Sequence, residues 1–575
     1  METVWKFLKS DKGVLCLAFL FAVPLFFLSL GADGIPAAQE GRTAIIVRNM
    51  LLTGNWCDMN IAHAVLYEKP IGHYWMCLPF AWLFGITAPE PGDLNYIEWG
   101  VRLPSAISAV LGLIAVAVLA KRIYGFRAAA LSVFVTATMM TFLHLGRIAH
   151  IDMPLAAAFA WSMLFFYIGY LENWKANGWI YGFYMMLVWG MILIGPLVLI
   201  LAGLVVLGMM IWSRRWKMLW EMRPLTGGLV FLIVTLPWYI LETVRTNGAF
   251  FEEFIVNQNI RRFTGIGSVY RGGRRMPFYY YLPKMFAGAL PWSLLSICAL
   301  ICFFKRILQF RFRKGSVFLL FWFLTGFLFF SFSALKRGDY LLPLYPALGI
   351  LTAAAVLKGC SSLPGLSKRW IWGWGVAALL VAVILGLSFS GILIRVAEMG
   401  LSGTVLHVAA SDAENTILIS RFINNHAFGM ILIALILLGI LYYLGTLMQK
   451  RRYTEALLIF CGVIFVIYAV NNAVVTPLSA ARRTVKPLAA EIRKAIPKDA
   501  EVVYYGELNT ELAFFINRPY DKTIKPASRY LMMDDSAYRK FRKKEKWQEW
   551  TLRLQTEKDH QYPVFFFTRN TSPEK

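Results

Sequence analysis

Lysine and arginine side chains occur in several short segments that separate long apolar stretches of the chain. These residues are, in chain order, Lys69, Arg147, Arg261, Arg262, Arg271, Arg274, Arg275, Lys284, Lys336 and Arg337. Ammonium and guanidinium groups bind phosphate through charge-assisted hydrogen bonds. If these side chains converge in the folded chain, they form a cationic site for an anionic ligand, and phosphate is the anion that fits it best.

The same charges also have a purely structural explanation. They could pair with carboxylates such as Glu252, Glu253 and Asp339, or with lipid headgroups. The sequence leaves both explanations open.

Three carboxylates are candidates for the proton acceptor of a transfer reaction: Asp33, Glu40 and Asp152. Asp152 opens an apolar run with Pro154 two residues later, and an aspartate in this position could cap a helix. An ionisable residue at membrane depth also tends to mark function. Capping and chemistry are compatible, so the sequence supports both roles for Asp152.

Membrane helices must position these residues. Hydrophobic residues make up 58% of the 575 residues and charged residues 16%, which is less charge than a soluble chain of this length carries. The apolar residues come in blocks near the roughly 20 residues that cross a bilayer as a helix. We therefore predict an all-α polytopic membrane protein with about thirteen transmembrane helices. Their expected ranges are 13–30, 103–120, 127–145, 153–170, 179–194, 196–212, 226–243, 286–304, 316–333, 341–357, 370–391, 428–446 and 454–472.

Basic residues orient these spans, because cytoplasmic loops are enriched in lysine and arginine. Three lysines before the first span place the N-terminus in the cytoplasm, and we expect the protein in a plasma (inner) membrane. The loops 31–100 and 244–285 then face outward and carry most of the charges named above. Within the first of them, residues 37–52 and 71–83 are amphipathic and are predicted to form helices in the membrane interface.

The chain divides into a transmembrane domain over residues 1–472 and a tail over residues 473–575. The tail alternates helix and strand patterns, which predicts a small α/β domain on the outward, periplasmic side. Its expected elements are a helix at 484–495, a strand at 501–505, a helix or strand at 510–516, a helix at 537–550 and a strand at 563–568.

The net charge of +25 could indicate nucleic-acid binding. The basic residues are distributed between the apolar blocks instead of forming one patch, so we predict membrane lipids as partners and no nucleic acid. The seven cysteines stand singly and show no metal-ligand spacing. The first apolar block has no clear small-residue cleavage site, and we expect it to be retained as an anchor.

A set of short motifs resembles a known family of membrane enzymes. Those of the first outward loop look like the corresponding loop of glycosyltransferase-C enzymes, in the branch that holds bacterial aminoarabinose transferases for lipid A and protein O-mannosyltransferases. The likeness covers roughly residues 10–360, and the order of the motifs carries it more than any single motif does. The motifs are Gln39-Glu40-Gly41-Arg42, Arg48-Asn49-Met50-Leu51, Thr53-Gly54-Asn55-Trp56, Tyr67-Glu68-Lys69-Pro70, His73-Tyr74-Trp75, Arg102-Leu103-Pro104-Ser105, Asp152-Met153-Pro154-Leu155, Asn259-Ile260-Arg261-Arg262-Phe263, Pro277-Phe278-Tyr279-Tyr280-Tyr281, Leu290-Pro291-Trp292 and Tyr340-Leu341-Leu342-Pro343.

The resemblance implies a donor, an acceptor and a set of roles. Enzymes of this family take a sugar from a polyprenyl-phosphate carrier and transfer it to a lipid or protein acceptor on the outward face of the membrane. Residues similar to those around the donor phosphate are Lys69, Arg262 and Tyr340, and Lys336 is a further candidate cation. Glu68 resembles a carboxylate that can bind a divalent metal ion, the one cofactor that the resemblance implies. Asp152 resembles the second acidic residue of the site.

The first-loop motif departs from the family at one position. The family has an aspartate, the proposed catalytic base, where this chain has Gln39 before Glu40 and Arg42. An amide does not accept a proton at neutral pH. Three explanations remain: Asp33, Glu40 or Asp152 supplies the base, the acceptor is an already ionised phosphate that needs no base, or the chain is an inactive relative.

A transporter of lipid-linked sugars is the main alternative function. Transporters place polar groups near the middle of the membrane on broken helices, often with an inverted repeat. The sequence shows no clear repeat, and its unexpected charges lie at one face of the membrane. We therefore predict an integral membrane glycosyltransferase, with the transporter and the inactive relative as alternatives.

Overall fold

The computed structural model describes residues 10–362 and 439–569, apart from 33, 36–37, 62–63, 66, 88–96, 176, 266–275, 310–312, 441, 448–449, 451, 478–483, 507–508, 522, 544–547 and 557–563. Two compact units divide the chain: residues 1–356 together with 467–575, and residues 357–466. In the second unit, Leu444, Leu447 and Ala456 form a small apolar cluster. The spans predicted at 370–391 and 428–446 fall wholly or largely outside the described residues.

Six helical segments in the described part of the chain are long and apolar enough to cross a membrane. They are Ile97–Tyr124 (α6), Asp152–Leu171 (α9), Pro224–Arg245 (α13 and α14), Lys314–Phe332 (α18), Gly338–Lys358 (η4 and most of α19) and Glu455–Ala473, which includes most of α24 (Tyr453–Val470). Shorter helices lie at the other predicted spans: α2 (Asp11–Ala22) with α3 (Pro24–Phe27), α7 (Phe126–Ala137), α10 (Asn177–Ile194) and α11 (Leu197–Ser213). The mostly helical architecture is confirmed, and the number of thirteen spans stays a prediction.

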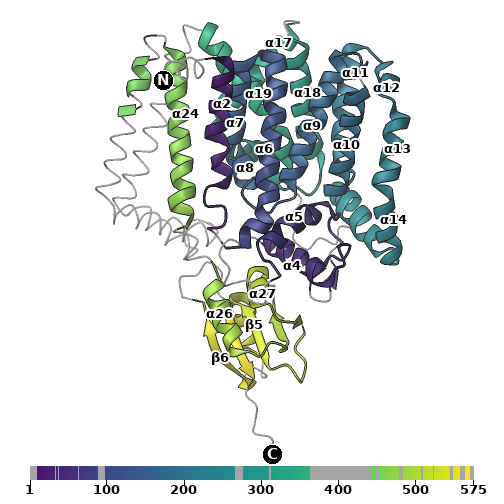
Figure 1. The fold of residues 1–575 in the computed structure, drawn as a ribbon, viewed down its shortest axis with the longest axis vertical. Helices are drawn as coiled ribbons and strands as arrows, with labels where there is room; N and C mark the ends of the chain where they lie inside the picture. The colour runs from purple at the N-terminus through teal and green to yellow at the C-terminus, as the bar shows by residue number, and fades with distance from the viewer. Residues whose placement is uncertain are drawn as a thin grey trace, which may run out of the picture. The chain divides into compact units, whose positions relative to one another are not determined.

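The six segments differ in how far other helices cover them. In α9 and in Gly338–Lys358, 83% of the most apolar window is buried, against 22% in Pro224–Arg245. Figure 1 shows α9 beside α6 and α10, and α6 beside α7. Helices α6 and α9 meet at small residues, and a Cβ on Gly112 of α6 would make an ordinary van der Waals contact of 3.6 Å with the Cβ of Ala157 in α9. The two most enclosed of the six segments begin at or next to two acidic residues, Asp152 and Asp339.

Besides the span of α2 and α3, where Pro24 follows the break, three predicted spans contain a break between two helices. Pro237 follows one break and Pro291 lies within another, and proline removes a backbone donor and clashes with the preceding turn. At the third break, Trp292 Nε1 donates a hydrogen bond of 2.9 Å to Thr138 Oγ1. The helix pairs are α13 (Pro224–Val234) with α14 (Leu236–Arg245), α16 (Tyr281–Gly288) with α17 (Ser293–Leu308), and α7 with α8 (Met140–Leu145).

The segment 31–100 contains two helices at the predicted positions. They are α4 (Ala38–Thr53) and α5 (Gly72–Leu83). Between them, β1 (Asn60–Ile61) pairs antiparallel with β2 (Ala64–Val65), a hairpin that the sequence did not predict. Two-residue strands are too short for their side-chain alternation to be recognised.

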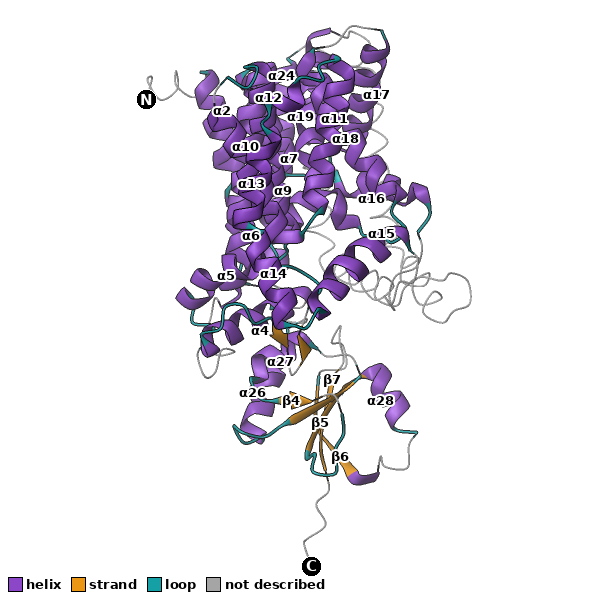
Figure 2. Cartoon of the chain, turned by 90° about the vertical axis from the view of Figure 1, so that its right-hand side faces the viewer, coloured by secondary structure: helices purple, strands orange, loops and turns teal. Residues whose placement is uncertain are grey.

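The tail folds into helices and strands, as predicted. Its five-stranded sheet has the order β4-β3-β5-β7-β6, with β3 parallel to β4 and β5 and the other pairs antiparallel (Figure 2). The elements are α26 (Lys486–Ala495), β3 (Val502–Tyr505), α27 (Thr510–Ile516), β4 (Tyr520–Asp521), β5 (Tyr530–Asp534), α28 (Asp535–Phe541), β6 (Trp550–Gln555) and β7 (Val564–Arg569).

Two details of the tail differ from, or complete, the prediction. The ambiguous segment 510–516 is a helix, and Asn509 caps it by accepting a hydrogen bond of 2.9 Å from the amide of Leu512. The helix predicted over 537–550 is wrong in extent, because α28 ends at Phe541 and Trp550 begins a strand. The ring of Trp550 belongs to the sheet core with Phe567, which a helix ending there would not allow.

Candidate functional site

Asp152 is the first residue of α9, and its carboxylate is directed toward His150. Its side chain is only 6% exposed, and its Oδ2 lies 3.2 Å from His150 Nδ1. Ile151, not Asp152, occupies the cap position, and no side chain caps this helix. The capping interpretation is therefore wrong, although a carboxylate in the first turn still interacts favourably with the helix dipole.

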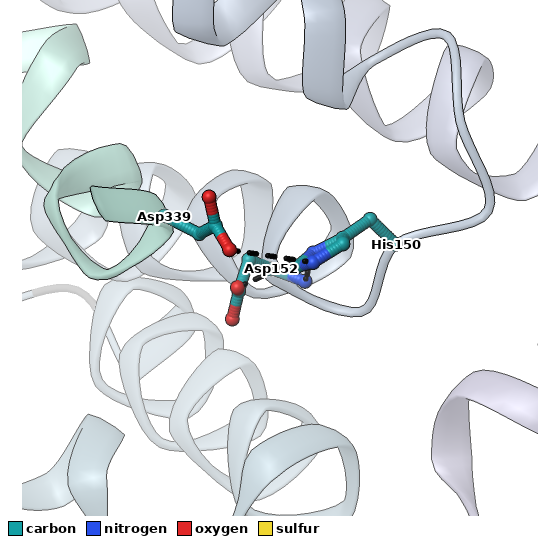
Figure 3. A group of neighbouring side chains, drawn as sticks. All are labelled: His150, Asp152 and Asp339. Atoms are coloured by element: carbon teal, nitrogen blue, oxygen red, sulfur yellow. Dashed lines mark hydrogen bonds and ion pairs between the residues drawn. The ribbon is translucent and has the colours of Figure 1, made fainter. Parts of the chain in front are cut away.

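Asp339 completes a group of three side chains that face one another (Figure 3). It comes from the 3₁₀ helix η4 (Gly338–Leu344), whereas His150 and Asp152 come from the start of α9. His150 Nε2 lies 3.7 Å from Asp339 Oδ2, and Arg337 donates to the same oxygen at 2.8 Å. An imidazole thus stands between two carboxylates, and a guanidinium balances part of their charge.

Lys69 shares an electrostatic environment with this group. Burial lowers the pKa of the Lys69 ammonium to about 8. The carboxylate of Asp152 raises that pKa, and the guanidinium groups of Arg262 and Arg337 lower it further. Lys69 of the first loop, Arg262 of the second loop and Asp152 of α9 are thus close enough to influence one another electrostatically.

Arg262 is held beside Tyr340. Its guanidinium carbon lies 5.5 Å from the centre of the Tyr340 ring, and its NH1 donates to Gln258 Oε1 at 2.9 Å. The neighbouring Arg261 instead pairs with Glu252 at 3.1 Å. The structural explanation thus holds for Arg261, whereas Arg262 lies with the candidate phosphate residues.

The side chain of Lys336 points toward backbone carbonyl groups, although the sequence suggested that it would bind phosphate. Its ammonium donates to the carbonyl of Met276 at 3.1 Å and to that of Ser333. Its neighbour Arg337 donates a hydrogen bond to Asp339, and its charge lowers the pKa of Lys69. Sequence reasoning identified both as unexpected charges and chose Lys336, because spacing alone does not tell which of two adjacent side chains points into a site.

Glu40 is engaged in a buried ion pair. Its side chain is 1% exposed, and Arg102 donates from Nε to Oε1 at 2.9 Å and from NH2 to Oε2 at 3.0 Å. The amide of Ala149 also donates to Oε1, at 2.7 Å. Both oxygens of Glu40 are therefore occupied, which favours a positioning role over proton transfer.

Of the remaining first-loop candidates, Gln39, Arg42 and Glu68 have other contacts and are not members of the group formed by His150, Asp152 and Asp339. Gln39 is partly exposed on α4, and its backbone carbonyl accepts a hydrogen bond from Thr43 at 3.0 Å. Arg42 and Glu68 form a partly exposed ion pair at 3.6 Å. Asp33 lies outside the described residues.

A metal ion would find suitable ligands in one place within the described residues. One ligand atom each from His150, Asp152 and Asp339 lies within 4.8 Å of the others. Imidazole nitrogen and carboxylate oxygen are the usual ligands of Zn²⁺, and carboxylate oxygen suits Mn²⁺. Glu68, the residue that the resemblance suggested, is not in this group. Sequence reasoning missed His150, although a histidine two residues before Asp152 was a visible signal.

Comparison with known proteins supports the resemblance seen in the motifs. The family model of dolichyl-phosphate-mannose-protein mannosyltransferases matches residues 68–241. The chain superimposes on ArnT from Cupriavidus metallidurans bound to undecaprenyl phosphate with a TM-score of 0.75 and 20% identity, covering 97% of this chain and 98% of that one. The chain thus has the fold of the ArnT structure, and part of it matches the mannosyltransferase family model. The resemblance seen in the motifs is thereby confirmed, and the protein is a multi-pass membrane protein.

Two curated relatives that match the chain carry the same name. It is 30% identical over 376 residues to the undecaprenyl phosphate-alpha-4-amino-4-deoxy-L-arabinose arabinosyl transferase of Erwinia tasmaniensis, covering 64% of each chain. It is 29% identical over 453 residues to the protein of the same name from Edwardsiella ictaluri, covering 78% of this chain and 74% of the relative. The matched part is thus about two thirds to three quarters of the length of these relatives.

We expect the Glu40–Arg102 pair to stabilise the fold strongly. Arg102→Leu leaves a buried carboxylate without its counter-ion and should lower the free energy of unfolding by about 3–5 kcal/mol. The double variant Glu40→Leu, Arg102→Leu should cost clearly less than the sum of the single changes, because no buried charge is left unpaired. Thermal unfolding of the purified protein in detergent measures both.

An exposed ion pair provides the control for this cycle. Arg122 and Glu172 are 42% and 36% exposed and lie 2.7 Å apart, so Arg122→Leu should cost less than about 1 kcal/mol. Equal melting temperatures for Arg102→Leu and Arg122→Leu would show that the buried pair contributes no special stability.

Proposed function

We propose that this chain transfers a sugar from a polyprenyl-phosphate donor to a lipid acceptor of the lipid A type. The observation that carries the proposal is the shared environment of Lys69, Arg262 and Asp152. The names of the relatives, and the undecaprenyl phosphate in the similar ArnT structure, support the same donor.

The donor chemistry explains the need for cations. In the proposed reaction, the bond between the anomeric carbon and the phosphate oxygen breaks, and polyprenyl phosphate leaves with the bonding electron pair. Lys69 and Arg262 would stabilise the charge that develops on the leaving phosphate, since preorganised cations act strongly in a site poor in water. Attack by the acceptor oxygen from the opposite side would invert the anomeric carbon.

The acceptor decides whether a base is needed. A hydroxyl must lose its proton as it attacks, and Asp152 is the carboxylate that could take it. An ionised phosphate on a lipid A-type acceptor needs no base. This agrees with the presence of Gln39, whose amide cannot act as a base, at the position where the family has its proposed base. For this reason we favour a phosphate acceptor, with a protein hydroxyl as the alternative.

His150, Asp152 and Asp339 would hold a divalent cation in this scheme. When bound, such an ion supplies positive charge near the donor phosphate. The residues themselves keep the imidazole fixed between two carboxylates, and Arg337 keeps Asp339 in place through its hydrogen bond of 2.8 Å.

We further propose the orientation that the basic residues indicate. The N-terminus lies in the cytoplasm, and the two long loops and the tail face the periplasm from the inner membrane. A lipid-linked donor suits that side, because a polyprenyl carrier can present a sugar there without a soluble nucleotide.

A transfer assay tests the proposed function. Purified protein would receive undecaprenyl-phosphate sugars and a lipid A-type acceptor, and released undecaprenyl phosphate would be quantified. We expect turnover by the wild type and a loss of at least about 10²-fold in Asp152→Asn, because the change removes a carboxylate charge from the environment of Lys69 and from the proposed cation ligands. Asp11→Asn is the matched control, since Asp11 is exposed and pairs only loosely with Arg127 at 3.5 Å.

The outcomes of this assay separate the alternatives. Turnover that survives Asp152→Asn removes Asp152 from the reaction. A wild-type protein that binds undecaprenyl phosphate but releases none from any donor sugar supports the transporter or the inactive relative.

The lowered pKa of Lys69 predicts a pH dependence of donor binding. Below a pH of about 8 the ammonium is charged and attracts the phosphate, and above it the free protein holds a neutral amine. The affinity for undecaprenyl phosphate should therefore fall by about tenfold for each pH unit above about 8. Lys69→Arg should remove this dependence, because a guanidinium stays charged.

Binding of undecaprenyl phosphate to nanodisc-embedded protein between pH 6.5 and 9.5 measures this effect. Parallel curves for wild type and Lys69→Arg across the whole range would show that the protonation of Lys69 does not control donor binding.

The metal group predicts direct binding of a divalent cation. Titration calorimetry of the purified protein with Mn²⁺ or Zn²⁺ should detect one site in the wild type and an affinity at least about tenfold weaker in Asp339→Asn. Glu68→Gln is the matched comparison, because it neutralises the carboxylate that the motif suggested. A loss of affinity in Glu68→Gln alone would place the metal at Glu68 instead of the group around His150.

A further inference from the structure

The tail approaches the first outward loop closely at helix α27. A Cβ on Gly41 of α4 would lie 2.9 Å from the backbone carbonyl carbon of Thr510, closer than real Cβ atoms come. Only glycine allows this distance between the two helices. The motif Gln39-Glu40-Gly41-Arg42 therefore lies directly against the tail.

Glu511, the next residue of α27, reaches the chain just before α4. Its side chain is 3% exposed, and Oε1 accepts hydrogen bonds of 3.2 Å from the amide of Ile35 and from Thr484 Oγ1. A Cβ on Gly34 would overlap this carboxylate oxygen, so the glycine leaves room for it. A carboxylate of the tail thus fixes the position of the Gly34–Ile35 backbone.

The backbone at Gly34 also contacts the buried ion pair of Glu40 and Arg102. Arg102 donates to the carbonyl of Gly34 and, at 2.8 Å, to that of Leu30, while it also holds Glu40. Glu40 in turn accepts a hydrogen bond from the amide of Ala149, the residue that directly precedes His150. A continuous series of contacts therefore leads from Glu511 to the segment that carries His150 and Asp152.

Other contacts hold the tail in place independently of Glu511. Arg48 NH1 donates to the carbonyl of Phe514 at 2.8 Å, and its guanidinium carbon lies 5.0 Å from the centre of the Phe514 ring. Lys486 pairs with the buried carboxylate of Glu98. Loss of the Glu511 carboxylate should therefore loosen the Gly34–Ile35 backbone without releasing the tail.

We propose that Glu511 is a positioning residue for the transfer reaction, acting through Gly34, Arg102 and Glu40 on the segment 149–152. This inference rests on the proposed transferase function. It gives the tail a specific role: its helix α27 completes the support of the candidate active site.

Kinetics of matched variants provide the first test. Glu511→Gln keeps the size of the side chain but weakens its hydrogen bonds, and it should lower kcat by about ten- to hundredfold with the donor KM within about twofold of wild type. Glu511→Asp should recover part of the loss. Glu549→Gln is the control, since Glu549 pairs with Arg569 at 3.1 Å within the tail, and its kcat should stay within about twofold.

Gly34→Ala tests the same contact from the other side. The added methyl group displaces the Glu511 carboxylate while the tail keeps its own sequence, so kcat should fall in the same way even if Glu511→Gln does not fold. A fall in kcat that is equal in Glu511→Gln and Glu549→Gln would mean general damage to the tail and would overturn the proposal.

Hydrogen exchange gives a second readout that needs no transferase activity. The amide of Ala149 is bonded to Glu40, so the peptide 145–152 should exchange at least about tenfold faster in Glu511→Gln than in wild type or Glu549→Gln. Unchanged exchange in this peptide overturns the positioning role even if kcat falls. If the wild type transfers no sugar at all, the proposed function fails, and the exchange result still decides whether Glu511 supports this segment.

Discussion

The buried ion pair of Glu40 and Arg102 is the interaction on which the candidate site depends. Removing two charges from water costs several kcal/mol for each, and only good geometry with further hydrogen bonds offsets that cost. Here the guanidinium binds both carboxylate oxygens and two backbone carbonyls, and the carboxylate accepts the amide of Ala149. The pair therefore joins α4, α6 and the segment before α9, three elements that are distant in the sequence.

The carboxylates of Glu40 and Asp152 differ in the partner that each one binds. Glu40 has a permanent guanidinium partner, so protonating it would break the strongest contact in the region. Asp152 instead contacts the imidazole of His150 at 3.2 Å. Of these two carboxylates, Glu40 is therefore the structural one, and Asp152 is the candidate for the reaction.

The sequence predicted the large features well, because they depend on composition and length. Apolar blocks located the helices, and arginines that break the charge rule located the residues around Lys69. The helix breaks at Pro237 and Pro291 had a visible cause, whereas the break at Thr138 depends on a hydrogen bond from Trp292, which is distant in sequence. Trp550 was misjudged because its strand pairs with β7, and pairing between strands is not encoded locally.

Individual side-chain directions were the least predictable part of the site. The choice between Lys336 and Arg337 depends on which residue faces the carbonyl of Met276, and the role of Glu40 depends on the distant Arg102. No local pattern contains either contact. By contrast, the order of the motifs predicted one site for Arg262 and Asp152, and both residues influence the pKa of Lys69.

The environment of Lys69 bears on the meaning of Gln39. A buried ammonium that lies near two guanidinium groups is destabilising in the free protein, and its lowered pKa expresses that cost. An anion bound among these cations would offset the cost, so the arrangement is suited to a phosphate ligand. Gln39 removes an acid from the exposed part of α4 but leaves the Glu40–Arg102 pair and the cations unchanged. We infer that the substitution affects which acceptor the chain can use. The residues that face the donor phosphate keep their chemistry.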